Sequence, residues 1–76
     1  MLKLSEMNVG ETGRIIKVNG TGIIRKRLLD MGVTPSSIVY LRKKAPLGDP
    51  IEITIRGYEL TLRTEESAFI DVELIG

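Results

Sequence analysis

The stretch of sequence that says most about the fold is the run IEITIRGYELTLR, from Ile51 to Arg63. Apolar residues alternate with polar residues in both of its halves, which is the pattern of two half-buried strands. A two-residue turn at Arg56 and Gly57 would bring the apolar side chains of both strands onto one face, and glycine readily adopts the positive φ that such a turn needs. The sequence therefore predicts a β-hairpin with three inward-facing apolar pairs, Ile51 with Leu62, Ile53 with Leu60 and Ile55 with Tyr58.

Outside this hairpin, the sequence predicts three more strands and one helix. The strands are expected at Ile38 to Ala45, Arg14 to Val18 and Phe69 to Leu74. Apolar residues at helical spacing predict a helix from about Thr21 to Met31, which Gly32 and Pro35 would end. Five short strands and one helix fit a mainly β fold in which the sheet curls into a small barrel, because a curled sheet leaves fewer unpaired edges than a flat one.

Short turns are expected to connect these elements. Pro46 and Gly48 suit a type I turn between the strand from Ile38 and the hairpin. Thr64 is expected to cap a single helical turn that leads into the last strand, because acidic residues follow it and favour a helix start. We expect a similar turn after Ser5.

Composition excludes several classes of function. The chain has 76 residues, which is enough for one small domain over residues 1–76. It has neither cysteine nor histidine, which excludes thiol nucleophiles, disulfides, imidazole bases and Cys/His zinc sites. No catalytic residue and no certain cofactor site is predicted, although carboxylates could hold a divalent metal weakly. The sequence lacks an apolar run long enough to cross a membrane and a secretory signal, which favours a cytoplasmic location.

Charge is unevenly distributed along the chain although the net charge is only +1. Residues 12–46 hold eight basic side chains and one acidic side chain, whereas residues 47–76 hold seven acidic and two basic ones. This asymmetry predicts a basic and an acidic patch if the fold keeps the two halves apart. The alternative is that the halves pair with each other within the domain.

Two exposed features are candidates for binding a partner protein. On the predicted helix, Arg25 and Lys26 face outward with Leu29 beside them, and an apolar residue among outward bases can contact an acidic, partly apolar partner. The alternative for Leu29 is burial under a loop. The second feature is the turn between the third strand and the hairpin, and together the candidate residues are Arg25, Lys26, Leu29, Leu47, Gly48 and Asp49.

Three other readings of the sequence remain open. Asp30, Asp49 and Glu52 could bind a metal ion, although an aspartate in a turn more often stabilises the turn. Tyr40, beside basic residues, is the one aromatic platform available for a nucleic acid. The Gly20-Thr21-Gly22 run resembles part of a dinucleotide fingerprint, but its third glycine is missing and it reads better as a flexible entry to the helix.

Longer motifs give the sequence a family resemblance. The runs RLLDMGVTP at Arg27 to Pro35, APLGDPIEI at Ala45 to Ile53 and RGYEL at Arg56 to Leu60 make it similar to the FeoA family, ferrous iron transport protein A. The resemblance covers nearly the whole chain, and the turn of Pro-Leu-Gly-Asp-Pro followed by Arg-Gly-Tyr is its most specific part. It implies an SH3-like barrel with an inserted helix.

The resemblance also implies a function. It points to a small, non-enzymatic cytosolic protein that binds and modulates the GTPase-bearing cytosolic part of FeoB, the ferrous iron permease. The family is also related to a domain of iron-dependent repressors, so a transition-metal-responsive regulatory module is the alternative, followed by a small nucleic-acid-binding barrel. The sequence departs from the family at Ser36, where a glycine is common, and at Ile38 and Tyr40, where polar residues are usual. Those two apolar residues predict self-association or an apolar partner contact.

Overall fold

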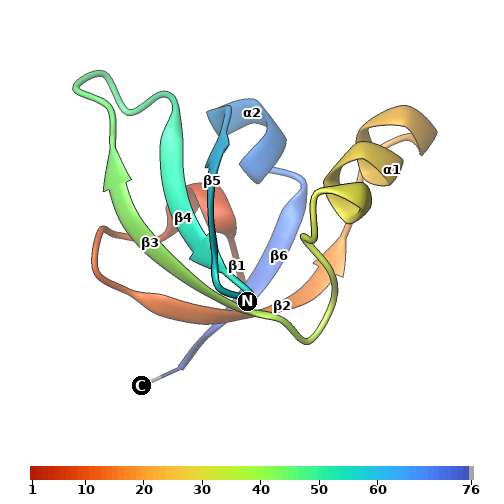
Figure 1. Ribbon diagram of the computed structural model, residues 1–76, viewed down its shortest axis with the longest axis horizontal. Coiled ribbons are helices and arrows are strands. Elements are labelled where there is room, and N and C mark those ends of the chain that lie inside the picture. The colour runs from red at the N-terminus through yellow and green to blue at the C-terminus, as the bar shows by residue number, and fades with distance from the viewer. Residues whose placement is uncertain (76) are drawn as a thin grey trace.

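The computed structural model describes residues 1–75 and contains one curled antiparallel sheet with a helix at its side (Figure 1). The strands lie in the order β1-β6-β2-β3-β4-β5. In chain order, the elements are β1 (Leu2–Lys3), the 3-10 helix η1 (Leu4–Glu6), β2 (Thr12–Val18), α1 (Gly22–Asp30), β3 (Ile38–Lys44), β4 (Ile51–Ile55), β5 (Tyr58–Leu62), α2 (Thr64–Ser67) and β6 (Ile70–Ile75).

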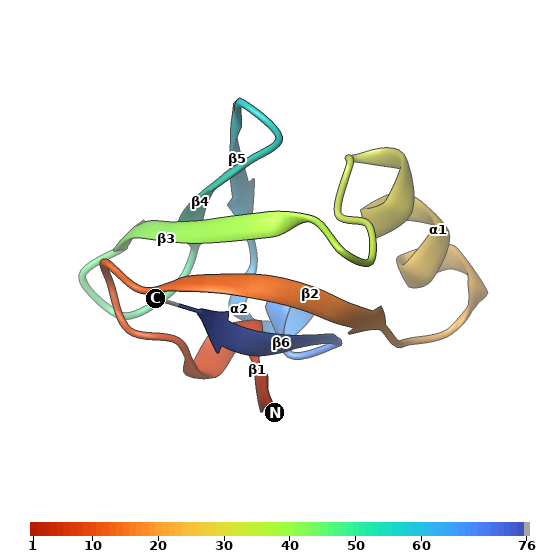
Figure 2. The same ribbon diagram turned by 90° about the horizontal axis from the view of Figure 1, so that it is seen from below.

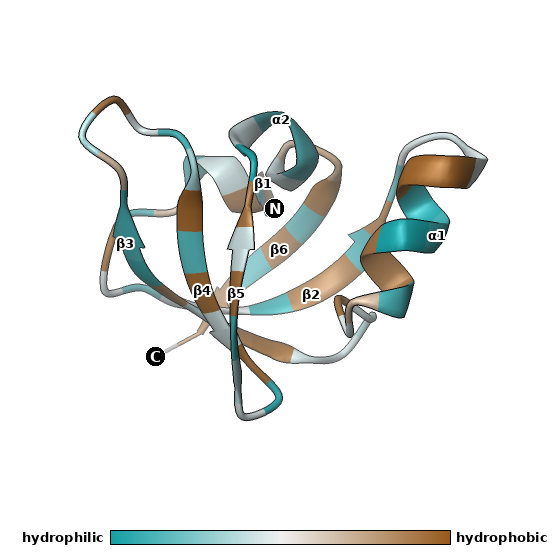
Figure 3. Ribbon diagram, turned by 45° about the horizontal axis from the view of Figure 1, so that its top comes forward, coloured by the Kyte–Doolittle hydropathy of each residue, from teal (hydrophilic) through white to brown (hydrophobic). Residues whose placement is uncertain are grey.

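The hairpin of β4 and β5 has the predicted register. Ile53 lies opposite Leu60, and the pairs on either side of it also match the prediction. Arg56 and Gly57 have φ angles of 50° and 83°, and positive φ at both central residues is the mark of a type I′ turn, whose twist suits a hairpin. The alternation of apolar and polar residues along β4 is visible as bands of opposite hydropathy in Figure 3.

Tyr58 is the exception on the inner face of the hairpin. It was predicted to lie in the core, but 69% of its surface is exposed, because it stands beside the turn where the sheet projects beyond the rest of the molecule. Leu60 is half-buried and packs against the core. The hairpin thus buries its β4 side fully and leaves the start of β5 open.

The sheet has one strand more than predicted. β1 contains two residues and pairs with β6, and it escaped prediction because two residues are too few to show an alternating pattern. β1 and β5 are the two ends of the strand order and do not pair, so the sheet is curled without being closed by hydrogen bonds. Register shifts in β2 and β3 interrupt the regular pairing, and such irregularities bend a sheet.

The core lies inside the curl of the sheet. Its buried side chains come from every strand except β1 and from η1, α1 and the loops, namely Leu4, Met7, Ile15, Val18, Leu28, Val33, Val39, Leu41, Ile51, Ile53, Ile55, Leu62, Ile70 and Val72. All are aliphatic, and Ser67 is the buried polar residue, whose hydroxyl donates a hydrogen bond to the Thr64 carbonyl. In the part of the chain that the structure describes, the buried interior is therefore almost entirely apolar.

The main helix agrees closely with its prediction. α1 has Thr21 and Met31 as its capping residues, and Gly32 follows with a φ of 96°, as expected for a glycine that ends a helix. Leu28 is fully buried and fixes the helix to the core. Within residues 1–75, neither helix has the length and apolar character required to span a bilayer.

The second helical turn begins one position earlier than predicted. Arg63 occupies the capping position of α2 and Thr64 is its first helical residue. The backbone N–H of Arg63 donates to Glu66, which is the glutamate of a capping arrangement. The Thr64 side chain is therefore not used to cap α2 and is available for other hydrogen bonds. The turn expected after Ser5 is η1, which starts at Leu4.

Candidate functional site

The exposed face of α1 combines charged and apolar residues, but two of its three predicted contact residues also serve the fold. Arg25 is exposed, yet its Nε donates to the carbonyl of Val18 in β2 at 3.2 Å. Leu29 is half-buried and packs against the core. Lys26 projects fully from the helix. A partner approaching this face would therefore meet Lys26 first.

The charge of Lys26 is shared with a neighbour one helical turn away. Its Nζ donates to Asp30 at 2.9 Å, and both side chains are largely exposed. This hydrogen bond, together with the negative charge of Asp30, raises the pKa of Lys26 above its ordinary value. Lys26 thus remains protonated at any physiological pH, and its pairing with Asp30 makes this part of the surface locally neutral.

Ile23 is an apolar residue on the helix surface that sequence reasoning did not single out. It is 85% exposed at the start of α1. The signal was present in the sequence, because Ile23 lies outside the inward stripe of Ile24, Leu28 and Met31. It adds an apolar contact point to the exposed face of the helix.

The turn between β3 and β4 presents Leu47 at its tip, with 97% of the side chain exposed. Behind it, Gly48 adopts a φ of 84°, and its N–H donates to the carbonyl of Ala45 at 2.7 Å. The Thr64 hydroxyl donates to the Gly48 carbonyl at 2.8 Å, and the Thr64 N–H donates to the carboxylate of Asp49 at 2.9 Å. The start of α2 therefore holds the turn in place. Leu47 is an exposed apolar side chain on this well-held turn.

The two parts of the predicted docking surface are not neighbours. Figures 1 and 2 both place α1 at one end of the molecule and the loop between β3 and β4 at the other. The structure thus brings Arg25, Lys26 and Leu29 together, and separately Leu47, Gly48 and Asp49. A partner that touches both groups has to span the molecule.

The two charged halves of the sequence pair with each other at several places. Arg27 in α1 contacts Glu66 in α2 at 3.3 Å, and Arg42 in β3 contacts Glu59 in β5 at 2.8 Å. Glu52 lies 3.5 to 3.6 Å from Lys43 and Arg42. For these side chains, the basic and acidic halves of the sequence therefore pair with each other within the domain. Fewer basic side chains of residues 12–46 are left for a partner than the sequence suggested.

The predicted metal ligands are not gathered at one place. Asp30 is paired with Lys26, Asp49 with Thr64 and Glu52 with two basic residues, as described above. Across residues 1–75, no three carboxylates come together as a group able to hold a metal ion. Among the described residues, Glu52 Oε2 is the buried side-chain oxygen that lacks a hydrogen-bond partner, and the charged groups beside it are the basic nitrogens of Arg42 and Lys43.

Ile38 and Tyr40 lie on the outer face of β3, with 45% and 41% of their surfaces exposed. Their neighbours across the strand pair are Arg14 and Thr12 of β2. The exposed ring of Tyr40 is thus available for a contact, but the next base along the strand, Arg42, is engaged with glutamates.

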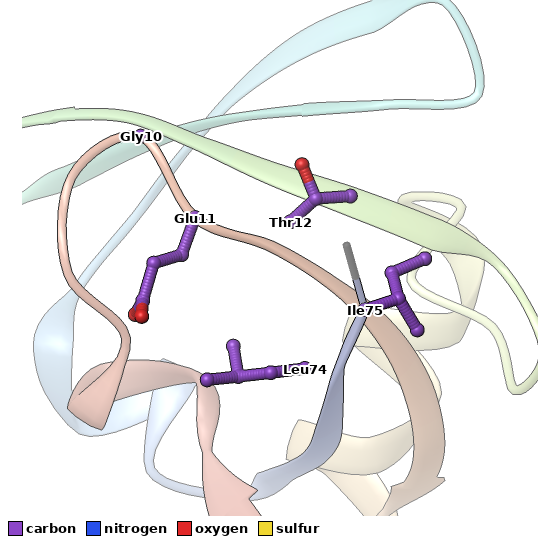
Figure 4. Close-up of a pocket in the computed structure, with 5 residues that line it drawn as sticks. All are labelled: Gly10, Glu11, Thr12, Leu74 and Ile75. Atoms are coloured by element: carbon purple, nitrogen blue, oxygen red, sulfur yellow. The ribbon is translucent and has the colours of Figure 1, made fainter.

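Several hollows occur on the surface. One of 490 Å³ lies where β2 begins and β6 ends, lined by Glu11, Thr12, Leu74, Ile75 and Gly10 (Figure 4). Its acidic group is already used, because the Glu11 carboxylate accepts the N–H of Asn8 at 2.6 Å. Sequence reasoning also missed two hollows between α1 and the rest of the molecule, which depend on tertiary packing. One lies against β5 and the other against α2.

Comparison with known proteins identifies the family. The FeoA domain model matches residues 2–74. The chain belongs to the FeoA family. It is 40% identical over 74 residues to the Fe(2+) transport protein A/Fe(2+) transporter FeoB fusion protein of Porphyromonas gingivalis, a match that covers 97% of this chain and 9% of that protein. The chain thus spans about a tenth of the length of that relative.

Solved structures of FeoA proteins share the fold. The FeoA-like protein of Clostridium acetobutylicum superposes with a TM-score of 0.91 at 34% identity, covering 97% of this chain and 86% of the other. FeoA of Stenotrophomonas maltophilia, solved with zinc and described as a prokaryotic SH3 domain protein, has a TM-score of 0.84 at 22% identity and covers 96% and 91% of the two chains. The fold class predicted from the sequence, a small mainly β SH3-like domain with one helix, is confirmed.

Proposed function

We propose that this FeoA chain acts as a non-enzymatic accessory protein of ferrous iron transport that docks on the cytosolic part of a FeoB-type permease and modulates it. The observation that carries the proposal is the Porphyromonas gingivalis protein, in which a segment 40% identical to this chain is fused to a FeoB transporter. Fusion keeps two domains at high effective concentration, which favours a contact between them. Residues 1–76 would act as one domain located in the cytoplasm.

Exposure and rigidity support the choice of docking surface. Lys26 and Ile23 project from α1, and Leu47 projects from the turn fixed by α2. Exposed apolar side chains on fixed elements make good contact points, because little conformational entropy is lost when they are covered. Arg25, Leu29, Gly48 and Asp49 would support these contacts by holding the helix and the turn in position.

The docking test is a titration of isotope-labelled protein with the soluble cytosolic domain of a FeoB-type permease, followed by NMR. We expect chemical shift changes at α1 and at residues 47–49. Lys26→Glu and Leu47→Ser should each weaken binding about tenfold, which corresponds to about 1.4 kcal/mol. The readout for modulation is the GTPase rate of the permease domain with and without this protein.

Matched controls separate docking from general effects. Lys17→Glu reverses an exposed charge on β2, and Val9→Ser removes an exposed apolar side chain from another loop. Both should leave binding unchanged. Shift changes confined to other elements would remove this docking surface, and an absence of binding by the wild-type protein would refute the proposed function itself.

A further inference from the structure

The strand β5 is the open edge of the sheet. It stands last in the strand order and pairs with β4 alone. In a hairpin with a two-residue turn, the residues that flank the turn exchange both of their backbone hydrogen bonds, and this pattern repeats at every second residue. Leu60 and Leu62 therefore bond to β4, whereas the N–H and C=O groups of Glu59 and Thr61 point away from it. In residues 1–75, neither residue has a backbone hydrogen bond outside the hairpin.

α1 lies on the side of β5 that faces away from β4 (Figures 1 and 3), and two surface hollows lie along α1, which together we call the β5 groove. One hollow of 300 Å³ lies between the end of α1 and the hairpin, with Met31, Tyr58 and Leu60 among its lining residues. A second hollow of 370 Å³ lies between α1 and α2, with apolar walls from Ile24 and Phe69. The first hollow thus offers an apolar site beside Leu60 of the unpaired strand, and the second offers one next to α2, the helix that follows this strand.

The ends of this groove carry opposite charges. Arg56 lines the hollow at the hairpin end, and Glu65 lines the hollow at the α2 end. Both side chains are exposed, and neither is in an ion pair among residues 1–75. By contrast, Arg27 and Glu66 between them are already paired with each other. Arg56 has a long hydrogen bond of 3.5 Å from its Nη1 to the Thr34 hydroxyl, which leaves its charge without an acidic partner. A ligand with one charge of each sign at its ends would place an opposite charge beside both groups and would have its direction fixed by them.

We propose that the edge of β5 binds an extended peptide segment of another protein, added to the sheet as an antiparallel strand. The segment would form backbone hydrogen bonds with Glu59 and Thr61, the mode of recognition known as β-strand addition. Alternate apolar side chains would enter the groove beside Met31 and Leu60. A basic residue at the amino end of the segment would meet Glu65, and an acidic residue at its carboxyl end would meet Arg56.

The direct probe of this edge is hydrogen exchange with and without a synthetic strand. In the protein alone, the amides of Glu59 and Thr61 should exchange faster than those of Leu60 and Leu62, which bond to β4. The probe is the capped peptide KVTVTVD, whose valine side chains would lie on the groove side of the extended sheet and whose threonine backbone N–H and C=O groups would point to the β5 edge. At about 1 mM peptide, exchange at Glu59 and Thr61 should slow by at least about tenfold, an effect visible even for weak binding.

Two controls isolate the backbone contribution. The same peptide with both threonines N-methylated keeps every side chain but loses the amide donors, and it should bind at least about tenfold more weakly. In the protein, Thr61→Pro removes an outward N–H without breaking a bond to β4, and it should weaken binding similarly. Thr61→Val retains the N–H and should bind as the wild type does.

Exchange of the charged ends tests the direction of the segment. The peptide DVTVTVK should lose affinity about tenfold as an antiparallel strand, and this loss should be absent in the double variant Arg56→Glu with Glu65→Lys. Unchanged exchange at Glu59 and Thr61 with saturating peptide would overturn the proposal. Protection of these amides in the protein alone that increases with protein concentration would also overturn it, because a second copy would then occupy the edge. These outcomes do not depend on the permease and leave the proposed docking function untouched.

Discussion

The backbone N–H of Thr64 and the carboxylate of Asp49 are 2.9 Å apart and form the hydrogen bond that ties the β3–β4 loop to the start of α2. The Thr64 hydroxyl strengthens the tie through the Gly48 carbonyl. Asp49 was predicted to take part in docking or metal binding, and the structure shows that its carboxylate also has a structural role. This contact positions Leu47, which touches little else.

Replacing Asp49 by alanine should therefore destabilise the protein in the absence of any metal. The Thr64 N–H belongs to the first turn of a helix and would lose its side-chain acceptor, which costs about 1 kcal/mol. Urea denaturation in the presence of a chelator measures this change, and Glu73→Ala, which removes an exposed carboxylate from β6, is the control. Equal stabilities of the Asp49→Ala variant and the wild type would show that the hydrogen bond contributes nothing.

The hairpin turn contains a residue that is poorly suited to its conformation. Arg56 has a φ of 50°, a left-handed value that asparagine and glycine tolerate better than arginine does. Arg56→Asn should therefore stabilise the protein by about 0.5 to 1 kcal/mol, measured by urea denaturation. Arg56→Ala retains the strain and serves as the control. If the asparagine variant is no more stable than the alanine variant, the turn does not store this strain.

The same substitution connects stability with binding. Arg56→Asn removes the cation at one end of the β5 groove, so it should weaken binding of the KVTVTVD peptide while it stabilises the fold. Opposite effects of one substitution on stability and binding are typical of residues retained for a function. A gain in both quantities would contradict a role for Arg56 in the groove.

Leu28 is the side chain that holds α1 against the sheet. It is fully buried, whereas the other apolar residues of the helix are only partly covered or exposed. Leu28→Ala should destabilise the protein by about 2 to 5 kcal/mol. Leu28→Met, which keeps most of the volume, should cost less than about 1.5 kcal/mol. Thermal or urea unfolding measures both.

An exposed isoleucine on the same helix gives the matched control. Ile23→Ala should change stability by less than about 0.5 kcal/mol, because Ile23 contacts mainly solvent. If Leu28→Ala were as mild as Ile23→Ala, the helix would be held by other contacts, and the wall of the groove would not depend on the core.

Local sequence patterns were sufficient for much of this fold. The hairpin was predictable because its alternation is uninterrupted and a glycine marks its turn, and α1 was predictable because Gly32 and Pro35 define its end. β1 was not predictable, since a two-residue strand exists only through its pairing with β6. Tyr58 was misplaced because the alternating pattern gives the face of a strand but not how far the sheet extends beyond the core.

The candidate site was less predictable for a related reason. Arg25 lies on the helix and Asp49 on the turn, as predicted, but no local pattern indicates that α1 and the turn lie at opposite ends of the molecule. The sequence likewise could not reveal that the Arg25 guanidinium donates to the Val18 carbonyl, or that the Asp49 carboxylate accepts the Thr64 N–H. The β5 groove depends on α1 packing across an open sheet edge, and residues such as Met31 and Leu60 become neighbours there only after folding.

Asp71 gives the stability of the protein a dependence on acid. Lys3 and Asn19 donate hydrogen bonds to its carboxylate, and these bonds lower its pKa from an ordinary value near 3.8. Its contribution to stability is therefore fully present above that value and is lost as the pH falls through the lower pKa of the folded state. Asp71→Asn should cost about 1 kcal/mol at neutral pH, and the difference from the wild type should shrink below about pH 4. Urea denaturation at several pH values tests this, with Glu73→Gln as the exposed control on the same strand. A difference that stayed constant down to strongly acidic pH would show that the charge of Asp71 contributes nothing, because protonation would then leave its stabilising effect intact.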